Sequence, residues 1–367
     1  MALALLFAVM PFLFHKNRMC YACMSFLGLI LVCTSYQAAN SIYIILAIYT
    51  AYRMWAENKS WKEIGIFSLI SIVCYIIALF YFRAFLMNTF AGDAIHRGTG
   101  IAHGSGMLGL VKKNLTEYFS FIRHSYGNIW IKAFTIISIL LFPFASAFRT
   151  KKGRLASFFF SIIVLCTMFL LSFGAYIVLE QTLISTRTMM GFDVLIALIA
   201  LHDIYGFADA DIMKKCSAIT VLCLFYGMGI GTTVYGNRIS KQKDYERFRF
   251  TILLQDLSHI VDASQHNSIY IGGTVGYAEK ERMERINYPA MNVGNPSPVL
   301  THYLLTNWNM EFEVLSEDDL GELDLRPEFK KQLTELPLIQ DTFYHTIYGK
   351  DNQYYVYLKA PTVKEWK

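Results

Sequence analysis

The chain has 367 residues, of which 54% are hydrophobic and 17% are charged, and its mean hydropathy is +0.37. Soluble domains carry about 25% charged residues, so this composition excludes a single soluble domain, and it is too apolar for a disordered chain. Residues 1–236 contain 18 Lys and Arg against 9 Asp and Glu, whereas residues 237–367 contain 15 against 19. This asymmetry predicts a transmembrane domain over residues 1–235 and a soluble domain over residues 236–367.

The seven cysteines all lie in the apolar part of the chain. Cys20 and Cys23 form a close pair, but no second pair and no histidine stands at the spacing of zinc ligands. Packing of small apolar side chains in a helix is therefore favoured over a metal site. We expect neither a metal nor another cofactor.

Apolar runs suited to membrane-spanning helices, which need about 20 residues, recur along the chain. The candidate spans are residues 1–14, 19–36, 39–55, 64–86, 129–148, 155–179, 189–207 and 216–235. The first run is incomplete, and it lacks the basic start and small-residue cleavage site of a signal peptide. The pattern predicts a mainly α, polytopic membrane helix bundle of about eight spans.

Basic residues gather in every second turn between these runs. They are Lys16, Arg18, Arg53, Lys59, Lys62, Arg149, Lys151, Lys152, Arg154, Lys214 and Lys215. Cytoplasmic loops carry an excess of Lys and Arg, so the loop 87–128, the turn 180–188 and the tail 236–367 should face the other side. Residue 1 would then begin outside the cytoplasm, which leads us to expect that an N-terminal portion is missing.

The loop 88–109 is rich in glycine, which lets backbone amides approach a ligand and form an anion-binding nest. It also supplies one carboxylate, two imidazoles and one guanidinium, from Asp93, His96, Arg97 and His103. The loop either contacts phosphate or sugar, or carries no ligand. Residues 115–126, which follow, have the mixed aromatic and basic pattern of an interfacial amphipathic helix.

Residues 180–193 form a second candidate segment. Arg187 stands at a helix entrance on the outer side, where its guanidinium suits a lipid phosphate, or it pairs with Glu180 or Asp193 as a structural bridge. His202 and Asp203 follow at membrane depth. Ionisable groups there are costly and indicate function by default, although packing against polar partners is common.

The tail begins with a charged helix, about residues 238–259, that continues from the last span. Strands are predicted at residues 268–273, 312–315 and 353–358. The acidic run 317–319 lacks the ligand spacing of a calcium loop and indicates a solvated loop. The tail is thus predicted to be a small α/β module, and no basic patch suggests nucleic acid as a partner.

The Ser-Tyr-Gln-Ala turn around Tyr36 and Gln37, followed by an Asn/Ile/Tyr-rich helix, resembles the bacterial membrane glucosyltransferases of the serotype-converting, O-antigen-modifying family. The Thr-Arg-Thr-Met-Met-Gly-Phe stretch at 186–192 and the Ile-Tyr-Ile-Gly-Gly strand at 269–273 are also similar. The resemblance implies the C-type glycosyltransferase fold in the bacterial inner membrane, with the C-terminal domain in the periplasm. The implied reaction moves glucose from a polyprenyl-phosphate donor to lipopolysaccharide O-antigen at the periplasmic face.

Under this resemblance the donor phosphate would be held by Arg187 or Arg97, and the substrates would be contacted by His96, His103, Tyr36 and Gln37. No residue is identified as the catalytic base, and Asp93 and Glu180 are the fallback candidates. In the family, a first span and an acidic periplasmic loop that supplies the base precede the segment at which this chain starts. We therefore expect the chain to insert into the membrane and to transfer sugar only when that portion is restored.

Two other classes of function remain open at this stage. A polytopic transporter or flippase of a lipid-linked sugar would carry midplane charges, for which Asp203 is weak support, but no inverted repeat is evident. A membrane anchor would present the tail to a partner. A transporter would work without the tail, whereas the enzyme would depend on residues of the outer side.

Overall fold

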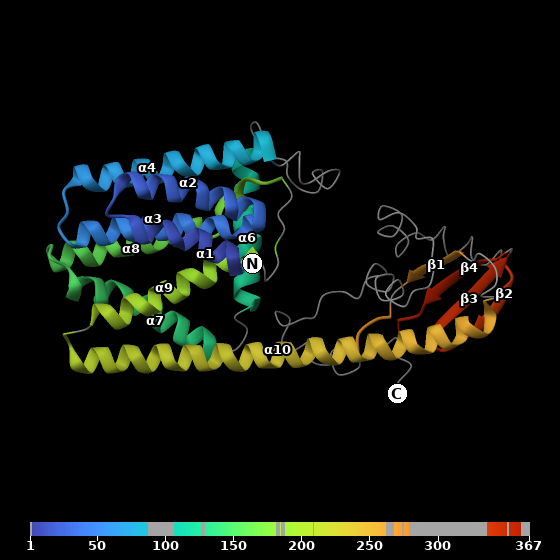
Figure 1. Ribbon diagram of the computed structural model, residues 1–367. Helices are drawn as coiled ribbons and strands as arrows, with labels where there is room; N and C mark the ends of the chain where they lie inside the picture. The colour runs from blue at the N-terminus through green and yellow to red at the C-terminus, as the bar shows by residue number, and fades with distance from the viewer. Residues whose placement is uncertain are drawn as a thin grey trace. The chain divides into compact units, whose positions relative to one another are not determined.

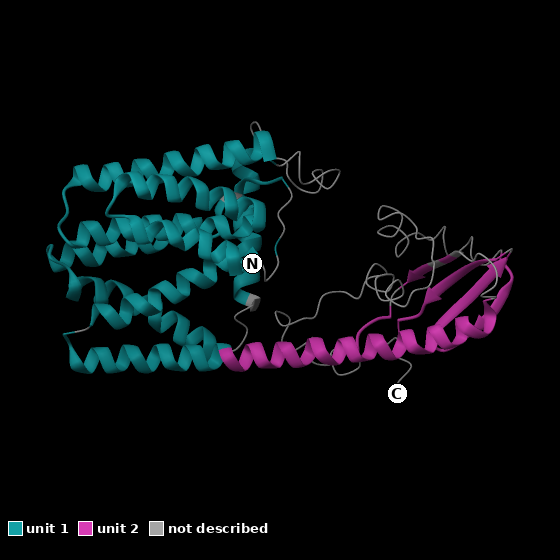
Figure 2. Cartoon of the chain, viewed as in Figure 1, with its two compact units in different colours: residues 1–228 teal, residues 229–367 magenta. Residues whose placement is uncertain are grey.

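The structure is a computed structural model, and it describes residues 2–86, 106–125, 129–180, 184, 188–207, 209–261, 268–273, 275–278, 336–350 and 352–360. The chain divides into two compact units, Met1–Met228 and Gly229–Lys367, which Figure 2 shows in different colours. The proposed division into a transmembrane part up to residue 235 and a soluble part after it rests on composition and stays a prediction.

Unit 1 is a bundle of helices (Figure 1). Its α-helices are α1 (Ala2–Val9), α2 (Arg18–Ser35), α3 (Asn40–Ala56), α4 (Trp61–Tyr81), α6 (Met107–Ser125), α7 (Ile129–Arg149), α8 (Arg154–Leu171), α9 (Met190–Gly206) and the start of α10 (Asp211–Ile260). Shorter helical turns are η1 (Met10–Phe14), η2 (Gln37–Ala39), η3 (Phe82–Leu86) and η5 (Gly174–Val178). Helix therefore forms at each of the eight predicted segments.

Five of the described helices are long and apolar enough to cross a membrane. They are Arg18–Ser35, Trp61–Leu86, Ile129–Arg149, Arg154–Leu171 and Asp211–Ile260. Helices α3 and α9 have 17 residues each, and Ala2–Phe14 is a shorter apolar helix. The prediction of a mainly α, polytopic membrane protein is confirmed.

Polar side chains cap two of these helices at their N-termini. The Asn17 side chain accepts hydrogen bonds from the first amides of α2, and Ser60 forms a capping box with Glu63 at the start of α4. Each cap satisfies amides that lack a partner within the helix. The apolar runs that follow therefore begin as helices at defined residues.

The predicted span 155–179 was too long, since α8 ends at Leu171. Gly174 has a φ of +59°, a left-handed conformation that ends an α-helix and that glycine adopts without steric cost. A Cβ at Gly174 would lie only 2.5 Å from the Asn40 Oδ1 atom of α3. The close contact with α3 thus keeps this position free of a side chain, and residues 174–178 continue as the separate turn η5.

Helix α9 packs against its neighbours along most of its surface, while Asp193, Leu201 and Tyr205 form an exposed stripe along it. Phe192, Leu195, Ile196 and Ile199 are all at most 3% exposed and belong to one core cluster with residues of α3, α7 and α8. Through these buried residues α9 joins α3, α7 and α8 in one apolar core.

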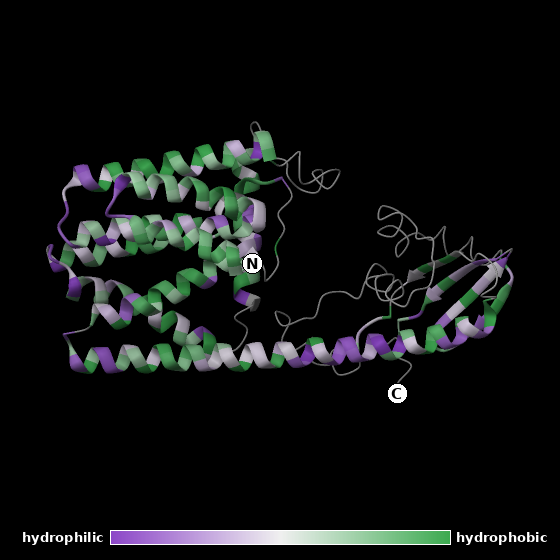
Figure 3. Cartoon of the chain, viewed as in Figure 1, coloured by the Kyte–Doolittle hydropathy of each residue, from purple (hydrophilic) through white to green (hydrophobic). Residues whose placement is uncertain are grey.

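The turns of unit 1 fall into two groups at opposite ends of the bundle (Figure 1). The basic end holds the turns α1–α2, α3–α4, α7–α8 and α9–α10, in which the Lys and Arg residues gather. The amide of Lys151 donates to the carbonyl oxygen of Ala56 over 2.9 Å, which joins two of these turns. Figure 3 shows hydrophilic residues at this end and mostly hydrophobic helix surfaces between the ends.

The opposite end, called here the Gln37 end, holds η2, η5 and the N-terminus of α9. Helix α6 lies across this end, transverse to α2 and α4 (Figure 1). Its predicted helical structure is confirmed, with Tyr118 buried while Lys112 and Lys113 are exposed. Its location at a membrane interface stays a prediction.

Unit 2 combines the rest of α10 with a four-stranded sheet. The strands are β1 (Ser268–Gly273), β2 (Leu338–Asp341), β3 (His345–Lys350) and β4 (Gln353–Leu358), in the order β1-β4-β3-β2. Strand β1 runs parallel to β4, and β3 pairs antiparallel with β2 and β4. The predicted charged helix and the predicted strands at 268–273 and 353–358 are confirmed, whereas 312–315 and 317–319 lie outside the described residues.

The core of unit 2 lies between α10 and the sheet. Apolar residues of α10 such as Leu253 and Leu257 pack with Ile269, Ile347 and Val356 of the strands. Arg249 of α10 is 2% exposed, and its guanidinium donates to carbonyl oxygens of Val275, Tyr344 and Lys359. Because these hydrogen bonds satisfy the buried cation, Arg249 fastens the helix to three segments at one end of the sheet.

Burial also affects a histidine of this unit. His345 of β3 is 1% exposed, and its Nε2 atom lies 2.9 Å from Oδ2 of Asp256 on α10. Burial lowers the pKa of His345 below its ordinary value, although the nearby Asp256 carboxylate opposes this shift. His345 is therefore held mainly in its neutral form.

We predict that Gly206→Ala destabilises the bundle. A Cβ at Gly206 would lie 2.6 Å from Cβ and 3.0 Å from the backbone of Ala145, so α9 would be pushed from α7 at a cost of about 1–3 kcal/mol. The measurement is the thermal unfolding midpoint of the full chain in detergent. Gly65→Ala is the matched control, because a Cβ there meets nothing within 4 Å. Equal midpoints for both variants would contradict the close packing of α9 on α7.

Candidate active site at the Gln37 end

Segments from three parts of the chain converge at the Gln37 end. The α2–α3 turn, the end of α8, η5 and the start of α9 meet around Ser41, which is 1% exposed. A Cβ at Gly191 would overlap the carbonyl oxygen of Ser172 and the side chain of Ser41, and a Cβ at Gly174 would lie 3.0 Å from Cβ of Ser41. The two glycines thus let the backbones approach closely and set the positions of the residues that follow them.

Helix α6 holds η5 in place through a buried asparagine. Asn114 is 1% exposed, and its side-chain amide donates to the carbonyl oxygens of Ile177 and Leu179 over 2.9 and 3.0 Å. Tyr118, one turn later, shares a hydrogen bond of 2.5 Å with the Ser172 hydroxyl. These contacts fix the backbone up to the residue before Glu180.

The structure places three of the predicted site residues at this one end. Tyr36 ends α2 and is half-buried, Gln37 opens η2 and is exposed, and Glu180 follows η5 and is exposed. Asp193, also exposed, lies in the first turn of α9. A carboxylate, an amide and a phenol on neighbouring segments suit the contacts that sugar hydroxyls make.

The other predicted site residues lie outside the described residues. They are Asp93, His96, Arg97, His103 and Arg187. The alternative that Arg187 pairs with Glu180 or Asp193 is therefore open, as is its contact with a phosphate. The roles of Asp93 and Glu180 as candidate bases also stay predictions.

The ionisable pair of α9 has polar partners inside the bundle. His202 is 4% exposed and lies 3.0 Å from both the Tyr49 hydroxyl of α3 and the Ser146 hydroxyl of α7. Asp203 is fully buried, and its Oδ2 accepts a hydrogen bond of 2.7 Å from Ser138 of α7. These contacts fasten α9 to α3 and α7, which favours the packing interpretation for His202.

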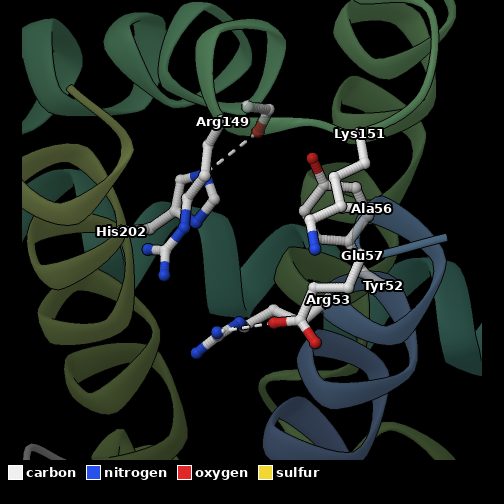
Figure 4. Close-up of a pocket in the computed structure, with 8 residues that line it drawn as sticks. Tyr52, Arg53, Ala56, Glu57, Arg149, Lys151 and His202 are labelled. Atoms are coloured by element: carbon white, nitrogen blue, oxygen red, sulfur yellow. Dashed lines mark hydrogen bonds and ion pairs between the residues drawn. The ribbon is translucent and has the colours of Figure 1, made fainter. Parts of the chain in front are cut away.

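A polar cavity lies at the basic end of the bundle. From the sequence, the Lys and Arg residues of this end indicated only which side of the membrane the turns face. The cavity has a volume of about 220 Å³ and includes Arg53, Glu57, Arg149, Lys151 and His202 in its lining. Figure 4 shows Arg149 and His202 on one side of it and Lys151, Tyr52 and Glu57 on the other. Because these residues come from helices distant in the chain, no local spacing in the sequence could have revealed the cavity.

No described residues form a cluster suited to a metal ion. In that part of the chain, no three His, Cys, Asp or Glu side chains lie together as metal ligands would. The expectation that the protein needs no metal or other cofactor stays a prediction.

We predict that Asn114→Leu loosens the segment before Glu180. The substitution keeps most of the side-chain volume but leaves two carbonyl oxygens unpaired, at about 1–3 kcal/mol. Faster hydrogen exchange of residues 174–180 in the full chain is the expected result. Thr116→Val is the control, since Thr116 is exposed and bonds only within α6. Exchange that is equally fast in both variants would contradict the anchoring role of Asn114.

Comparison with known proteins identifies the bundle. The profile of the family described as Glucosyl transferase GtrII matches residues 1–198, which include the whole Gln37 end with Tyr36, Gln37 and Glu180. Comparisons with curated proteins and with solved structures give no match. The match covers more than half of the 367 residues. The chain belongs to the Glucosyl transferase GtrII family, a family of glycosyltransferases.

Proposed function

We propose that the protein transfers glucose from a polyprenyl-phosphate donor to lipopolysaccharide O-antigen. The reaction would take place at the periplasmic face of the bacterial inner membrane. The observation that carries the proposal is the family match, which spans the segments that converge at the Gln37 end. Substrate contacts there would come from Tyr36, Gln37 and, by sequence, His96 and His103.

The chemistry needs a base and a group that holds the phosphate. The acceptor hydroxyl oxygen attacks the anomeric carbon of glucose, its proton passes to a carboxylate, and the bond from that carbon to the phosphate oxygen breaks. Polyprenyl phosphate leaves with the electron pair, and a guanidinium stabilises its charge through two parallel hydrogen bonds. Glu180 or Asp93 would act as the base, and Arg187 or Arg97 would hold the phosphate.

The orientation follows from the grouping of the basic turns. Since cytoplasmic loops are rich in Lys and Arg, the basic end would face the cytoplasm and the Gln37 end the periplasm. Residues 236–367 would then be periplasmic as well. Lipid-linked donor and acceptor would both reach the Gln37 end from the same leaflet.

A transporter or flippase of a lipid-linked sugar is not favoured. Its main support in the sequence was Asp203, which accepts a hydrogen bond from Ser138 inside the bundle. The family match points instead to a transferase.

The orientation predicts opposite labelling of two introduced cysteines. In a chain without its native cysteines, Lys350→Cys in unit 2 should react with a membrane-impermeant maleimide in intact spheroplasts. Lys59→Cys, in the basic α3–α4 turn, should react only after lysis. Both lysines are exposed, so accessibility differs only through the membrane. The reverse pattern would contradict the proposed orientation.

If Glu180 is the base, Glu180→Gln should lower transfer by about 10²–10⁴-fold, because the amide cannot accept the hydroxyl proton. The measurement is transfer of labelled glucose from polyprenyl-phosphoglucose to lipid-linked O-antigen in membranes containing the protein. Glu117→Gln is the matched control, an exposed carboxylate on α6 at the same end. Turnover that is unchanged in Glu180→Gln would move the role to Asp93.

A further inference from the structure

The cavity at the basic end carries an excess of positive charge. Arg53 pairs with Glu57 over 2.8 Å. Arg149 and Lys151, which also line the cavity, have no carboxylate partner among the described residues. Two cations therefore face one cavity without a counter-ion from the part of the chain that the structure describes.

The position of the cavity along the bundle suits a lipid headgroup. It lies where α3, α7 and α9 end, so it is at the depth at which a spanning helix leaves the hydrocarbon region. Tyr52 and His202 form its inner part, and His202 is bonded to Tyr49 and Ser146. Tyr52 and His202 are buried, whereas the two cations are exposed.

An apolar groove begins at the same tyrosine. Its volume is about 480 Å³, and its lining includes Tyr52, Trp55, Trp61 and Phe160 near the basic end and Tyr43 and Leu171 farther along. The stretch of α3 from Tyr43 to Trp55 is about 18 Å long at 1.5 Å per residue, which is close to the length of an extended acyl chain. Tyr52 lines both the groove and the basic cavity.

We propose that the basic cavity and the apolar groove together bind one anionic phospholipid of the bilayer. Its phosphate lies between Arg149 and Lys151, where the planar guanidinium donates two hydrogen bonds and the ammonium adds a point charge. One acyl chain lies along α3 in the groove. Basic pockets between membrane helices suit anionic headgroups because each cation near the membrane surface strengthens binding.

This site is distinct from the proposed transfer site, which lies at the Gln37 end. A lipid phosphate is nevertheless common to a bilayer phospholipid and to a polyprenyl-phosphate donor. The charge of the phosphate does not distinguish these two lipids, but the position of the binding site in the bundle does. The donor phosphate is needed beside the candidate bases, and Glu180 is at the opposite end of the bundle from Arg149.

Binding can be measured by native mass spectrometry of the full chain in neutral detergent, titrated with phosphatidylglycerol. Arg149→Gln/Lys151→Gln should weaken binding about 25-fold, at about fivefold for each cation removed. Lys214→Gln/Lys215→Gln is the matched control, because it removes two exposed basic charges at the same end but outside the cavity. It should bind phosphatidylglycerol as the wild type does.

A third variant excludes misfolding as the cause of a loss. Among the described residues that line the cavity, Glu57 is the only carboxylate. Glu57→Gln removes it and frees Arg53, so binding should strengthen about fivefold. Phosphatidylcholine of the same chain length should bind weakly to every variant. Unfolding midpoints of the double variants, measured in the same detergent, should match the wild type.

Three results would overturn the proposal. The first is equal affinity for phosphatidylglycerol in the wild type and in Arg149→Gln/Lys151→Gln. The second is complete displacement of phosphatidylglycerol by millimolar inorganic phosphate, which would identify a free-phosphate site without a role for the groove. The third is displacement by polyprenyl phosphate at a lower concentration than phosphatidylglycerol itself requires, which would assign the cavity to the donor lipid. The first two results leave the proposed transfer at the Gln37 end untouched, whereas the third would also contradict a donor site at that end.

Discussion

The close packing of α9 within the bundle is the constraint on which both sites depend. At its first turn, Gly191 has no side chain and so leaves room for the backbone of Ser172 and the side chain of Ser41. At its last turn, Gly206 leaves room in the same way for Ala145 of α7. Between these glycines the helix buries Leu195, Ile196 and Ile199 in the core of the bundle. Because both ends are held at backbone distance, α9 sets the geometry of η5 and Glu180 at one end and of His202 at the other.

The sequence predicted the elements of the fold well because hydrophobic runs and basic turns are local signals. Strand β4 begins and ends at the predicted residues, and helices form at all eight predicted spans. The predicted end of the span 155–179 was wrong by eight residues, because α8 ends at Leu171. That error has a physical reason, since Gly174 has a left-handed φ and leaves no room for a side chain beside Asn40 of α3. Residue hydropathy contains no information on such close packing.

The candidate site was predictable only in its chemistry. Tyr36, Gln37 and Glu180 were recognised as residue types and do lie at one end of the bundle. The support for that end was not recognised, because Asn114 looks like any polar residue of an amphipathic helix until α6 is placed over η5. The basic cavity escaped notice for the same reason, since Arg53, Arg149 and His202 meet only through helix packing.

Under the proposed orientation and lipid site, the basic turns have two roles that act at different stages. During insertion, Lys and Arg in short turns set the orientation through their number, and individual positions are interchangeable. In the folded bundle, position matters, because Arg149 and Lys151 share a cavity whereas Lys214 and Lys215 do not. A bound anionic lipid would neutralise the two cations beside the buried contacts of His202 with Tyr49 and Ser146. It would thereby stabilise the same end of α9 that Gly206 brings against α7, and so support the helix whose other end adjoins the proposed transfer site.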